Sequence, residues 1–309
     1  MPSLIIPAPK IDLKHWQAFE QITDGVMHTV AETSQRVYDQ TFRAWAAWCE
    51  SNGNPPTNLR PALVVAFLKS ENIAKSTRQR QLSALRQLAR VMSLIDQSQH
   101  PIYEALKMVK APTGNITSER KRRSLEVDQA RRLMSIFSDS AKLLDLRNRA
   151  MIALMLSTGL RRAEVVALQW KDIDLKQGIL IVRHGKGDKP REVAIVCDAA
   201  IRALTHWRTE QGDRQYVFTP ITKAGRILHD KPITSQTVWE CVKLASKRTG
   251  IEVSPHDARR THITELLLTQ PLADVQAQAG HAHGSTTIRY AHGADAIKRR
   301  AKFKLRYGD

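Results

Sequence analysis

The chain has 309 residues, and its 48 Lys and Arg against 30 Asp and Glu give a formal net charge of +18. Hydrophobic residues make up 42% of it, a proportion that is typical of a packed core and excludes a disordered chain. The positive charge predicts a polyanionic partner. Nucleic acid is favoured over an anionic membrane, because no segment has the pattern of a basic amphipathic anchor.

The first helices are predicted between residues 15 and 110, after an N-terminal extension of residues 1–14. Four aromatic residues recur at the spacing of one helix face: Tyr38, Phe42, Trp45 and Trp48. We expect this helix to end near Asn52. A second helix is expected to start around Pro61, a residue suited to the first turn, and a third near Ser76 and Thr77, which are good N-cap types.

The third helix has a stripe of Leu and Met residues that predicts its buried face. Five basic residues are expected to lie largely off this stripe: Lys75, Arg78, Arg80, Arg86 and Arg90. Two interpretations are open, a solvated helix face or a helix laid against a DNA groove with its cations on phosphates. The second makes these five the candidate DNA-binding residues.

Residues 111–123 have the composition of an exposed linker, with Pro112, Gly114 and a basic cluster. The net charge is +4 over residues 1–120 and +14 over residues 121–309. Most of the positive charge therefore belongs to the second part of the chain.

That second part, residues 124–309, mixes helices with a short hairpin. Helices are expected over residues 125–136, 144–157, 199–207, 235–246, 261–268 and 272–279, and a basic, helix-prone tail over 294–307. Strands are expected at 179–182 and 192–196, around a turn at Gly185-Lys186-Gly187-Asp188. The predicted fold class is mainly α with a small β-sheet or hairpin: a helical N-terminal domain and a mixed α+β second domain.

Cationic side chains in distinctive local contexts are the candidates for chemistry. In the segment T-G-L-R-R-A-E, Gly159 can end one helix and leave Arg161 at the start of the next. An arginine there offers a rigid fork to phosphate oxygens, and Glu164 can hold its guanidinium in place. The alternative is an ordinary Arg–Glu pair on a helix surface.

Lys186 stands between two glycines on the predicted hairpin turn. Such a lysine can be an exposed turn residue, or a proton donor that the hairpin delivers into a site. Farther along, His256 and Arg259 are three residues apart where a helix is expected to begin after Pro255, so they can face the same way. An imidazole beside a guanidinium suits an anionic ligand.

Gly280 and His281 are followed nine residues later by Tyr290. A lone tyrosine can simply pack in a core. Near several cations its phenol could instead act as a nucleophile, because the developing phenolate charge is stabilised there.

A metal site is the alternative for the histidines at 256, 262, 281, 283 and 292. No cysteine pair or H-E-x-x-H motif accompanies them, and carboxylates are sparse, so we expect no metal. The glycine-rich P-loop pattern is absent too, which removes the commonest sign of a bound nucleotide. No cofactor motif is therefore apparent in the sequence.

Three widely spaced cysteines favour a reducing compartment over a disulfide framework. The N-terminal apolar patch is broken by prolines and is a poor signal peptide. The longest apolar run, residues 150–156, is too short to cross a bilayer. We expect a cytoplasmic protein without a membrane partner.

Taken in order, these motifs resemble the tyrosine recombinase (phage integrase) family, in its simple two-domain Xer or Cre-like type. The family pattern is an arginine in T-G-L-R-x-x-E, a lysine on a hairpin turn, H-x-x-R, then G-H and a tyrosine nine residues later. The matching residues are Arg161, Lys186, His256, Arg259, His281 and Tyr290. Residues 15–110 resemble the family's helical core-binding (SAM-like) domain, and residues 124–309 its catalytic domain. Arg260 departs from the pattern, since many members have a second histidine there.

The resemblance implies a site-specific recombinase or integrase that cuts and rejoins DNA through a 3′-phosphotyrosyl intermediate, without metal or ATP. It implies that Arg161, Arg259 and His281 bind the non-bridging phosphate oxygens. It makes Tyr290 the nucleophile and Lys186 the acid that protonates the leaving 5′ oxygen, while His256 assists proton transfer at the tyrosine.

The same resemblance implies double-stranded DNA with inverted-repeat sites as the partner and a tetramer of this chain in the synaptic complex. Accessory DNA-bending proteins and an association with the nucleoid are further expectations. Two alternatives stay open. One is a non-catalytic DNA-binding regulator with the same fold, and the other is DNA relaxation like that of a type IB topoisomerase.

Overall fold

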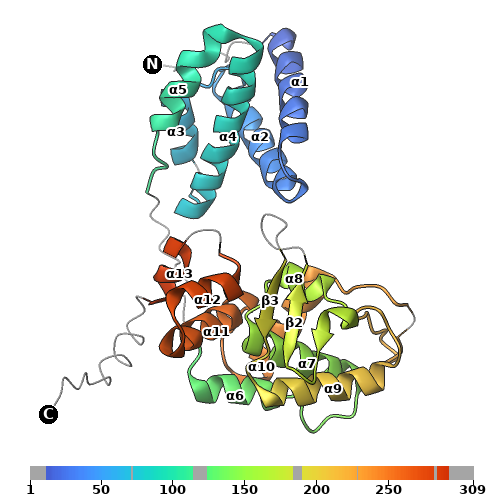
Figure 1. Cartoon of the computed structure of the whole chain (residues 1–309). Helices are drawn as coiled ribbons and strands as arrows, with labels where there is room; N and C mark the ends of the chain where they lie inside the picture. The colour runs from blue at the N-terminus through green and yellow to red at the C-terminus, as the bar shows by residue number, and fades with distance from the viewer. Residues whose placement is uncertain are drawn as a thin grey trace, which may run out of the picture. The chain divides into compact units, whose positions relative to one another are not determined.

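The computed structural model (Figure 1) describes residues 12–70, 72–113, 124–183, 190–227, 229–281 and 284–291. Of Thr33, Arg289 and Ala291 it describes only the backbone. The chain divides into two compact units, residues 1–120 and 121–309. The predicted fold class is confirmed, because both units are built mainly of helices and the second also contains a small sheet.

The described part of the first unit consists of α1 (Leu13–Thr29), α2 (Glu32–Ser51), α3 (Pro61–Ser70), α4 (Lys75–Ile95) and α5 (His100–Met108), with a short 3₁₀ turn at Gln97–Gln99. The predicted end of α2 at Asn52 and the start of α3 at Pro61 are confirmed. The predicted start of α4 is wrong by one or two residues. Its N-cap is Ala74, so Ser76 and Thr77 lie in the first turn.

Aromatic residues form the centre of this first core. The indole of Trp45 is fully buried, and its Nε1 donates to the carbonyl of Pro56 at 2.8 Å. The rings of Trp48 and Phe67 pack against it, with centroids 5.4 and 5.3 Å away. The aromatic face predicted for this helix therefore does bury itself, which fixes α2 against α3.

The second unit surrounds the long helix α7 (Leu143–Thr158) with the helices and strands that precede and follow it (Figure 1). Its other helices are α6 (Val127–Ser135), α8 (Arg162–Ala167), α9 (Asp198–Gln211), α10 (Ser235–Thr249), α11 (Pro255–Thr269), α12 (Leu272–Ala279) and α13 (Gly284–Ala291). Helix α7 is buried on nearly all sides, and Ala150, Met151 and Leu154 have no solvent-exposed surface. Such a helix is the central element of a core.

A small antiparallel sheet runs in the order β1 (Ile173–Asp174), β2 (Ile179–Val182), β3 (Arg191–Ala194). The predicted hairpin is confirmed, since β2 pairs with β3 from Ile179 opposite Ala194 to Val182 opposite Arg191. This register places Arg191 at the end of the ladder nearest the turn. The turn itself, with Lys186, lies outside the described residues.

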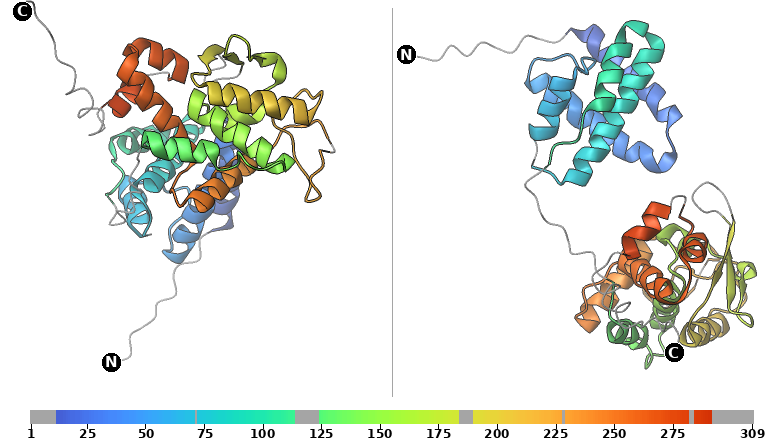
Figure 2. Two further views of the ribbon diagram at one scale, coloured as in Figure 1. Left: turned by 90° about the horizontal axis from the view of Figure 1, so that it is seen from below. Right: turned by 60° about the vertical axis from the view of Figure 1, so that its left-hand side comes forward.

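Helices α11, α12 and α13 lie side by side (Figure 2), and each packs against the other two. They share a separate apolar cluster. The cluster consists of Ile263, Leu266, Leu267, Val275, Ala279 and Tyr290. It packs α12, and α13 through Tyr290, against α11, and this is where the predicted functional residues come together.

No helix in the described ranges is long and apolar enough to cross a membrane. All three cysteines are unpaired, and two of them, Cys49 and Cys241, are buried. They act in the structure as small apolar side chains.

Candidate active site

The turn between α7 and α8 depends on Gly159. This residue caps α7 in the left-handed conformation, with φ of 62°, and its amide donates to the carbonyl of Met155. A Cβ atom here would lie 2.7 Å from the His262 ring, so both the backbone conformation and the space require glycine. The predicted consequence is present: Arg161 stands at the N-cap of α8.

Glu164 is the carboxylate around which two arginines assemble. It is 7% exposed, and each of its oxygens accepts two hydrogen bonds. Oε1 accepts from Nη1 of Arg161 at 2.7 Å and Nη1 of Arg191 at 3.0 Å, and Oε2 accepts from the Arg161 amide at 2.7 Å and Nη2 of Arg191 at 2.9 Å. Burial raises the pKa of Glu164, but the hydrogen bonds from Arg191 and Arg161 outweigh it and hold the pKa below its ordinary value.

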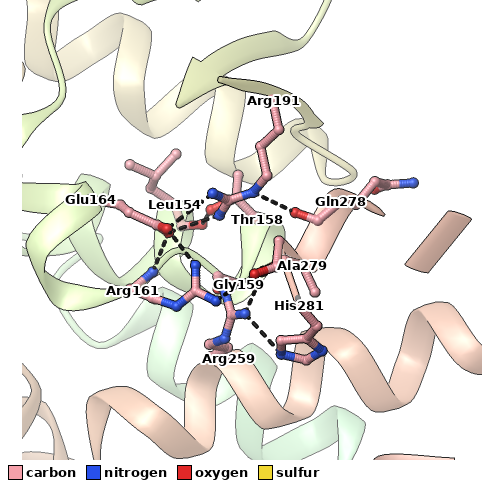
Figure 3. A network of polar contacts seen from close by, with 11 residues as sticks. Leu154, Thr158, Gly159, Arg161, Glu164, Arg191, Arg259, Gln278, Ala279 and His281 are labelled. Atoms are coloured by element: carbon pink, nitrogen blue, oxygen red, sulfur yellow. Dashed lines mark hydrogen bonds and ion pairs between the residues drawn. The ribbon is translucent and has the colours of Figure 1, made fainter. Parts of the chain in front are cut away.

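The last carbonyls of α12 and its cap receive three arginines from three different elements (Figure 3). Nε of Arg191 donates to the carbonyl of Gln278 at 2.8 Å, Nη2 of Arg259 to that of Ala279, and Nη2 of Arg161 to that of Gly280 at 2.8 Å. These carbonyls have no partner within a helix, and the C-terminal end of a helix favours cations. The end of α12 therefore gathers the guanidinium groups from β3, α11 and the α7–α8 turn.

Arg259 reaches this point from the first turn of α11. That helix begins at Pro255, and the Ser254 and Asp257 side chains form a capping box. Arg259 is 4% exposed, and its Nη1 also donates to the carbonyl of Gly159 at 2.7 Å. Burial and the neighbouring charge of Arg161 lower the pKa of Arg259 to about 10.

His281 follows directly after the capped end of α12. Its Nε2 lies 3.0 Å from Nη2 of Arg259 and its Nδ1 2.8 Å from the Thr287 hydroxyl. Because a guanidinium can only donate, Nε2 must be the acceptor, which assigns the neutral ring with its proton on Nδ1. Burial, followed by the charges of Arg259 and Arg161, lowers the pKa of His281 to about 4, in agreement with a neutral imidazole.

Tyr290 on α13 lies beside this imidazole. The two rings are stacked, with centroids 5.8 Å apart and planes 9° from parallel. The Arg260 guanidinium carbon lies 4.9 Å from the centroid of the tyrosine ring, a cation–π contact. Tyr290 is 7% exposed, and its ring belongs to the apolar cluster of α11–α13. The phenol is therefore anchored by packing as well as by charge.

Four of the six predicted catalytic residues thus converge: Arg161, Arg259, His281 and Tyr290. His256, in the first turn of α11, is exposed, and its charge acts on His281, so it borders the same group. Lys186 lies outside the described residues. Histidines 283 and 292 of the alternative metal set lie outside them too, and the described ranges hold no group of three or more potential metal ligands.

The prediction for the arginines of α4 is wrong in part. Arg78 is 5% exposed, because it stands four residues before Leu82 and so falls on the leucine stripe instead of beside it. Arg86 donates through Nε to the carbonyl of Leu106 at 2.9 Å and through Nη2 to those of Lys107 and Val109. Its guanidinium closes the end of α5. Lys75, Arg80 and Arg90 are exposed.

Arg191, Arg260 and Thr287 are site residues that sequence reasoning did not find. Arg191 lies between the predicted turn and the predicted second strand, and nothing local signals that it contacts Glu164 or Gln278. Arg260 carried a signal, because it departs from the family's usual histidine. Thr287 carried none beyond its position between His281 and Tyr290.

The chain is similar to known proteins over most of its length. A family model described as the Phage integrase family matches residues 123–296, more than half of the chain. Tyrosine recombinase XerA of Thermococcus kodakarensis is 26% identical over 283 residues, which cover 91% of this chain and 90% of the relative. Tyrosine recombinase XerD of Lacticaseibacillus casei is 31% identical over 268 residues, covering 85% and 88%.

Solved structures show the same fold at low identity. The Tn1549 transposon integrase, in complex with transposon right end DNA, superimposes with a TM-score of 0.70 at 15% identity, covering 92% of this chain and 98% of that one. A crystal structure of XerA recombinase gives a TM-score of 0.51 at 20% identity, covering 95% and 99%.

The chain therefore belongs to the Phage integrase family. It is a tyrosine-type site-specific recombinase, and its named relatives do not favour the regulator and topoisomerase alternatives.

Proposed function

We propose that Tyr290 cuts DNA by forming a 3′-phosphotyrosyl bond, and that Arg161, Arg259 and His281 hold the phosphate that it attacks. The observation that carries this proposal is the convergence of three guanidinium groups and an imidazole beside one buried phenol. A phosphodiester in transition carries extra negative charge on its non-bridging oxygens, and fixed cations stabilise that charge.

The arginines differ in what they can still bind. Contacts among the described residues use two of the five N–H donors of Arg161, and its side chain is 32% exposed. Arg259 is deeper and fixed by the carbonyls of Gly159 and Ala279, with Nη2 directed at Nε2 of His281. A phosphate oxygen placed near that pair would accept from the Arg259 guanidinium, which its carbonyl contacts already hold in position. Nε2 of His281, which is an acceptor in this structure, would donate to the phosphate once the ring proton moves there from Nδ1.

The chemical step balances without an external energy source. The Tyr290 oxygen forms a bond to phosphorus as it loses its proton, and the bond from phosphorus to the 5′ oxygen breaks. Lys186 is the proposed donor of the proton that the 5′ oxygen takes, and His256 the group that assists proton transfer at the phenol. A 5′ hydroxyl of another strand can then reverse the reaction, so neither metal nor nucleotide is consumed.

The partner and the assembly are also proposals. We propose double-stranded DNA with inverted repeats as the substrate, four copies of this chain in the synaptic complex, and accessory DNA-bending proteins as cofactors of assembly. Residues 15–110 would act as the core-binding domain, with Lys75, Arg80 and Arg90 on α4 as its phosphate contacts. Residues 124–309 would form the catalytic domain. The proposed location is the cytoplasm, on the nucleoid.

The test uses a nicked suicide duplex whose site is selected from a random-sequence library by binding to the wild-type chain. The wild type should form a covalent DNA–protein adduct without added metal, and Tyr290→Phe should form none while binding the duplex with unchanged affinity. An adduct with Tyr290→Phe would refute the assigned nucleophile. Binding without any adduct from the wild type would instead favour a regulator.

A further inference from the structure

Arg191 is the arginine of this cluster that the family resemblance did not assign. We infer that Arg191 is a positioning residue for strand cleavage. It holds Arg161 in place through Glu164, and it holds His281 in place through the end of α12. The inference rests on the proposed function, because it concerns the residues that hold the phosphate.

The first of these two contacts is the pairing of Arg191 with Glu164. Nη1 and Nη2 of Arg191 donate to the two carboxylate oxygens at 3.0 and 2.9 Å, in the bidentate geometry that an arginine fork favours. The same two oxygens accept from the side chain and the amide of Arg161 at 2.7 Å. Arg191 therefore fixes the carboxylate that orients Arg161.

The second is its contact with the segment before His281. Nε of Arg191 donates to the carbonyl of Gln278 at 2.8 Å. A Cβ atom on Gly280 would lie 3.0 Å from Cζ, Nε and Nη1 of Arg191, so the guanidinium lies directly against the backbone there. Gly280 also has a φ of 61°, which favours glycine. The Arg191 side chain thus fixes the chain at the residue preceding His281.

Arg191 is less exposed to solvent than Arg161, the arginine that it orients. The side chain of Arg191 is 11% exposed and that of Arg161 32% exposed. Three of the five N–H donors of Arg191 are engaged by the carboxylate and the carbonyl. A DNA phosphate would accordingly meet Arg161, while Arg191 acts from behind it.

Charge gives a second way to detect the role. Among the causes that lower the pKa of His281 to about 4, burial is the largest, and the charges of Arg259, Arg161, Arg191 and His256 follow. Removing the Arg191 cation should raise the pKa of His281 toward its ordinary value. If the neutral imidazole is the active form, the acid limb of the cleavage rate then moves to higher pH. Because a loss of burial around His281 would raise this pKa too, the variant Arg191→Lys, which keeps the charge, separates the two causes.

The experiment measures single-turnover adduct formation by the full chain on the suicide duplex described above, for the wild type, Arg191→Met and Arg191→Lys. Arg191→Met should cleave about 100-fold more slowly at saturating protein, because small displacements of reacting groups cost about that much. Its affinity for DNA should change by less than about threefold, because the phosphate contacts Arg161 and not Arg191. A loss confined to the rate marks an interaction that matters in the transition state. The acid limb should move to higher pH.

Arg191→Lys keeps the charge but offers a single point donor in place of the fork, so it should restore part of the rate and leave the acid limb unchanged. Arg248→Met is the matched control, because Arg248 likewise pairs with a largely buried carboxylate, Asp145, and lies over the Phe137 ring. It should leave rate, affinity and pH profile as in the wild type.

Two results would overturn the inference while the wild type still forms its adduct: cleavage by Arg191→Met within about threefold of the wild type, or an affinity for DNA that falls in parallel with the rate. The second would make Arg191 a DNA contact. If Arg191→Met does not fold, Arg191→Lys carries the same test, and a wild-type rate in that variant excludes a role for the fork. Failure of the wild type to form an adduct would contradict the proposed function, not this inference alone.

Discussion

In both units arginines bind the carbonyls at the end of a helix, but they do so in opposite ways. At the end of α5, one side chain, Arg86, donates to the carbonyls of Leu106, Lys107 and Val109. At the end of α12, the carbonyls of residues 278, 279 and 280 are each taken by a different arginine, from β3, α11 and the α7–α8 turn. The first arrangement closes a helix, whereas the second assembles a site.

The difference lies in how much charge and binding capacity remain. Arg86 directs its contacts to one short segment and makes α5 more rigid. Of the three arginines of the second unit, Arg161 and Arg191 pair with one buried carboxylate, Glu164, and Arg161 stays partly exposed. Three cations against one anion leave a net positive point that an anionic ligand can neutralise. The same local bond, from guanidinium to carbonyl, therefore serves stability in one unit and recognition in the other.

The largest expected effect follows from removing the shared anion. Glu164→Gln should lower the free energy of unfolding of the second unit by about 3–5 kcal/mol, because it leaves the largely buried Arg191 and the partly buried Arg161 without their counter-charge and faces them with an amide NH₂. Urea denaturation of the full chain, followed by circular dichroism, measures the loss.

The matched control is Asp128→Asn. Asp128 pairs with Arg131 on the surface of α6, where both side chains are more than three-quarters exposed, so its loss should change stability little. Equal stability of Glu164→Gln and the wild type would mean that the arginine cluster does not depend on the carboxylate, and the contrast between the two helix ends would lose its basis.

The positive charge of the site also lowers the pKa of a buried histidine beside it, His262. Burial and the charge of Arg259 lower the pKa of His262 to about 4, although its bond to the Leu156 carbonyl opposes this. As the pH falls below the ordinary value of 6.5, the unfolded chain gains a proton that the folded chain does not bind until about pH 4. The stabilisation is therefore complete above pH 6.5 and is lost progressively between 6.5 and 4, to an extent on the order of 3 kcal/mol.

Calorimetric unfolding of the wild type and of His262→Gln at several pH values between 7 and 4 checks this. The variant should lose less stability on acidification, because it lacks the titrating ring, while His206→Gln on the exposed face of α9 should follow the wild type. If the wild type and His262→Gln show the same slope, His262 does not titrate differently in the folded chain, and the charge cluster does not extend to it.

How far the sequence predicts this site depends on whether a residue acts through local spacing. The turn at Gly159, the start of α11 after Pro255 and the position of His281 at the end of α12 are set by neighbouring residues, and all three follow from glycine, proline and capping patterns. Arg191 acts through contacts with Glu164 and Gln278, which are far away in the chain. No local pattern contains that information, so only the fold could show it.

The fold divides in the same way. Helices with a strong apolar stripe or a glycine cap, such as α7 and α12, start and end within a residue or two of where they are expected, and α3 starts at the expected Pro61. Short helices such as α5 and α13 have too few turns for a periodic pattern and were not predicted, and for α8 only the start was. The burial of Arg78 was missed for a different reason. A charged residue at a stripe position looks like a surface residue until the neighbours that cover it are known.

The smallest expected effect separates the two kinds of arginine within α4 itself. Arg86→Met should lower the free energy of unfolding of the first unit by about 2 kcal/mol, because three carbonyls at the end of α5 lose a charged donor. Arg90→Met, at an exposed position one turn later, should leave stability almost unchanged.

In DNA binding the order of the two variants should reverse. Arg90→Met should reduce the slope of log affinity against log salt by about one, as expected for one lost phosphate contact, and Arg86→Met, assayed where it is folded, should leave that slope unchanged. Urea denaturation and salt-dependent binding to the selected duplex measure both quantities in the same three proteins. A reduced slope in Arg86→Met would show that its guanidinium reaches DNA as well as α5, in which case a helix-capping arginine can serve both purposes, and the contrast between the two helix ends is one of degree.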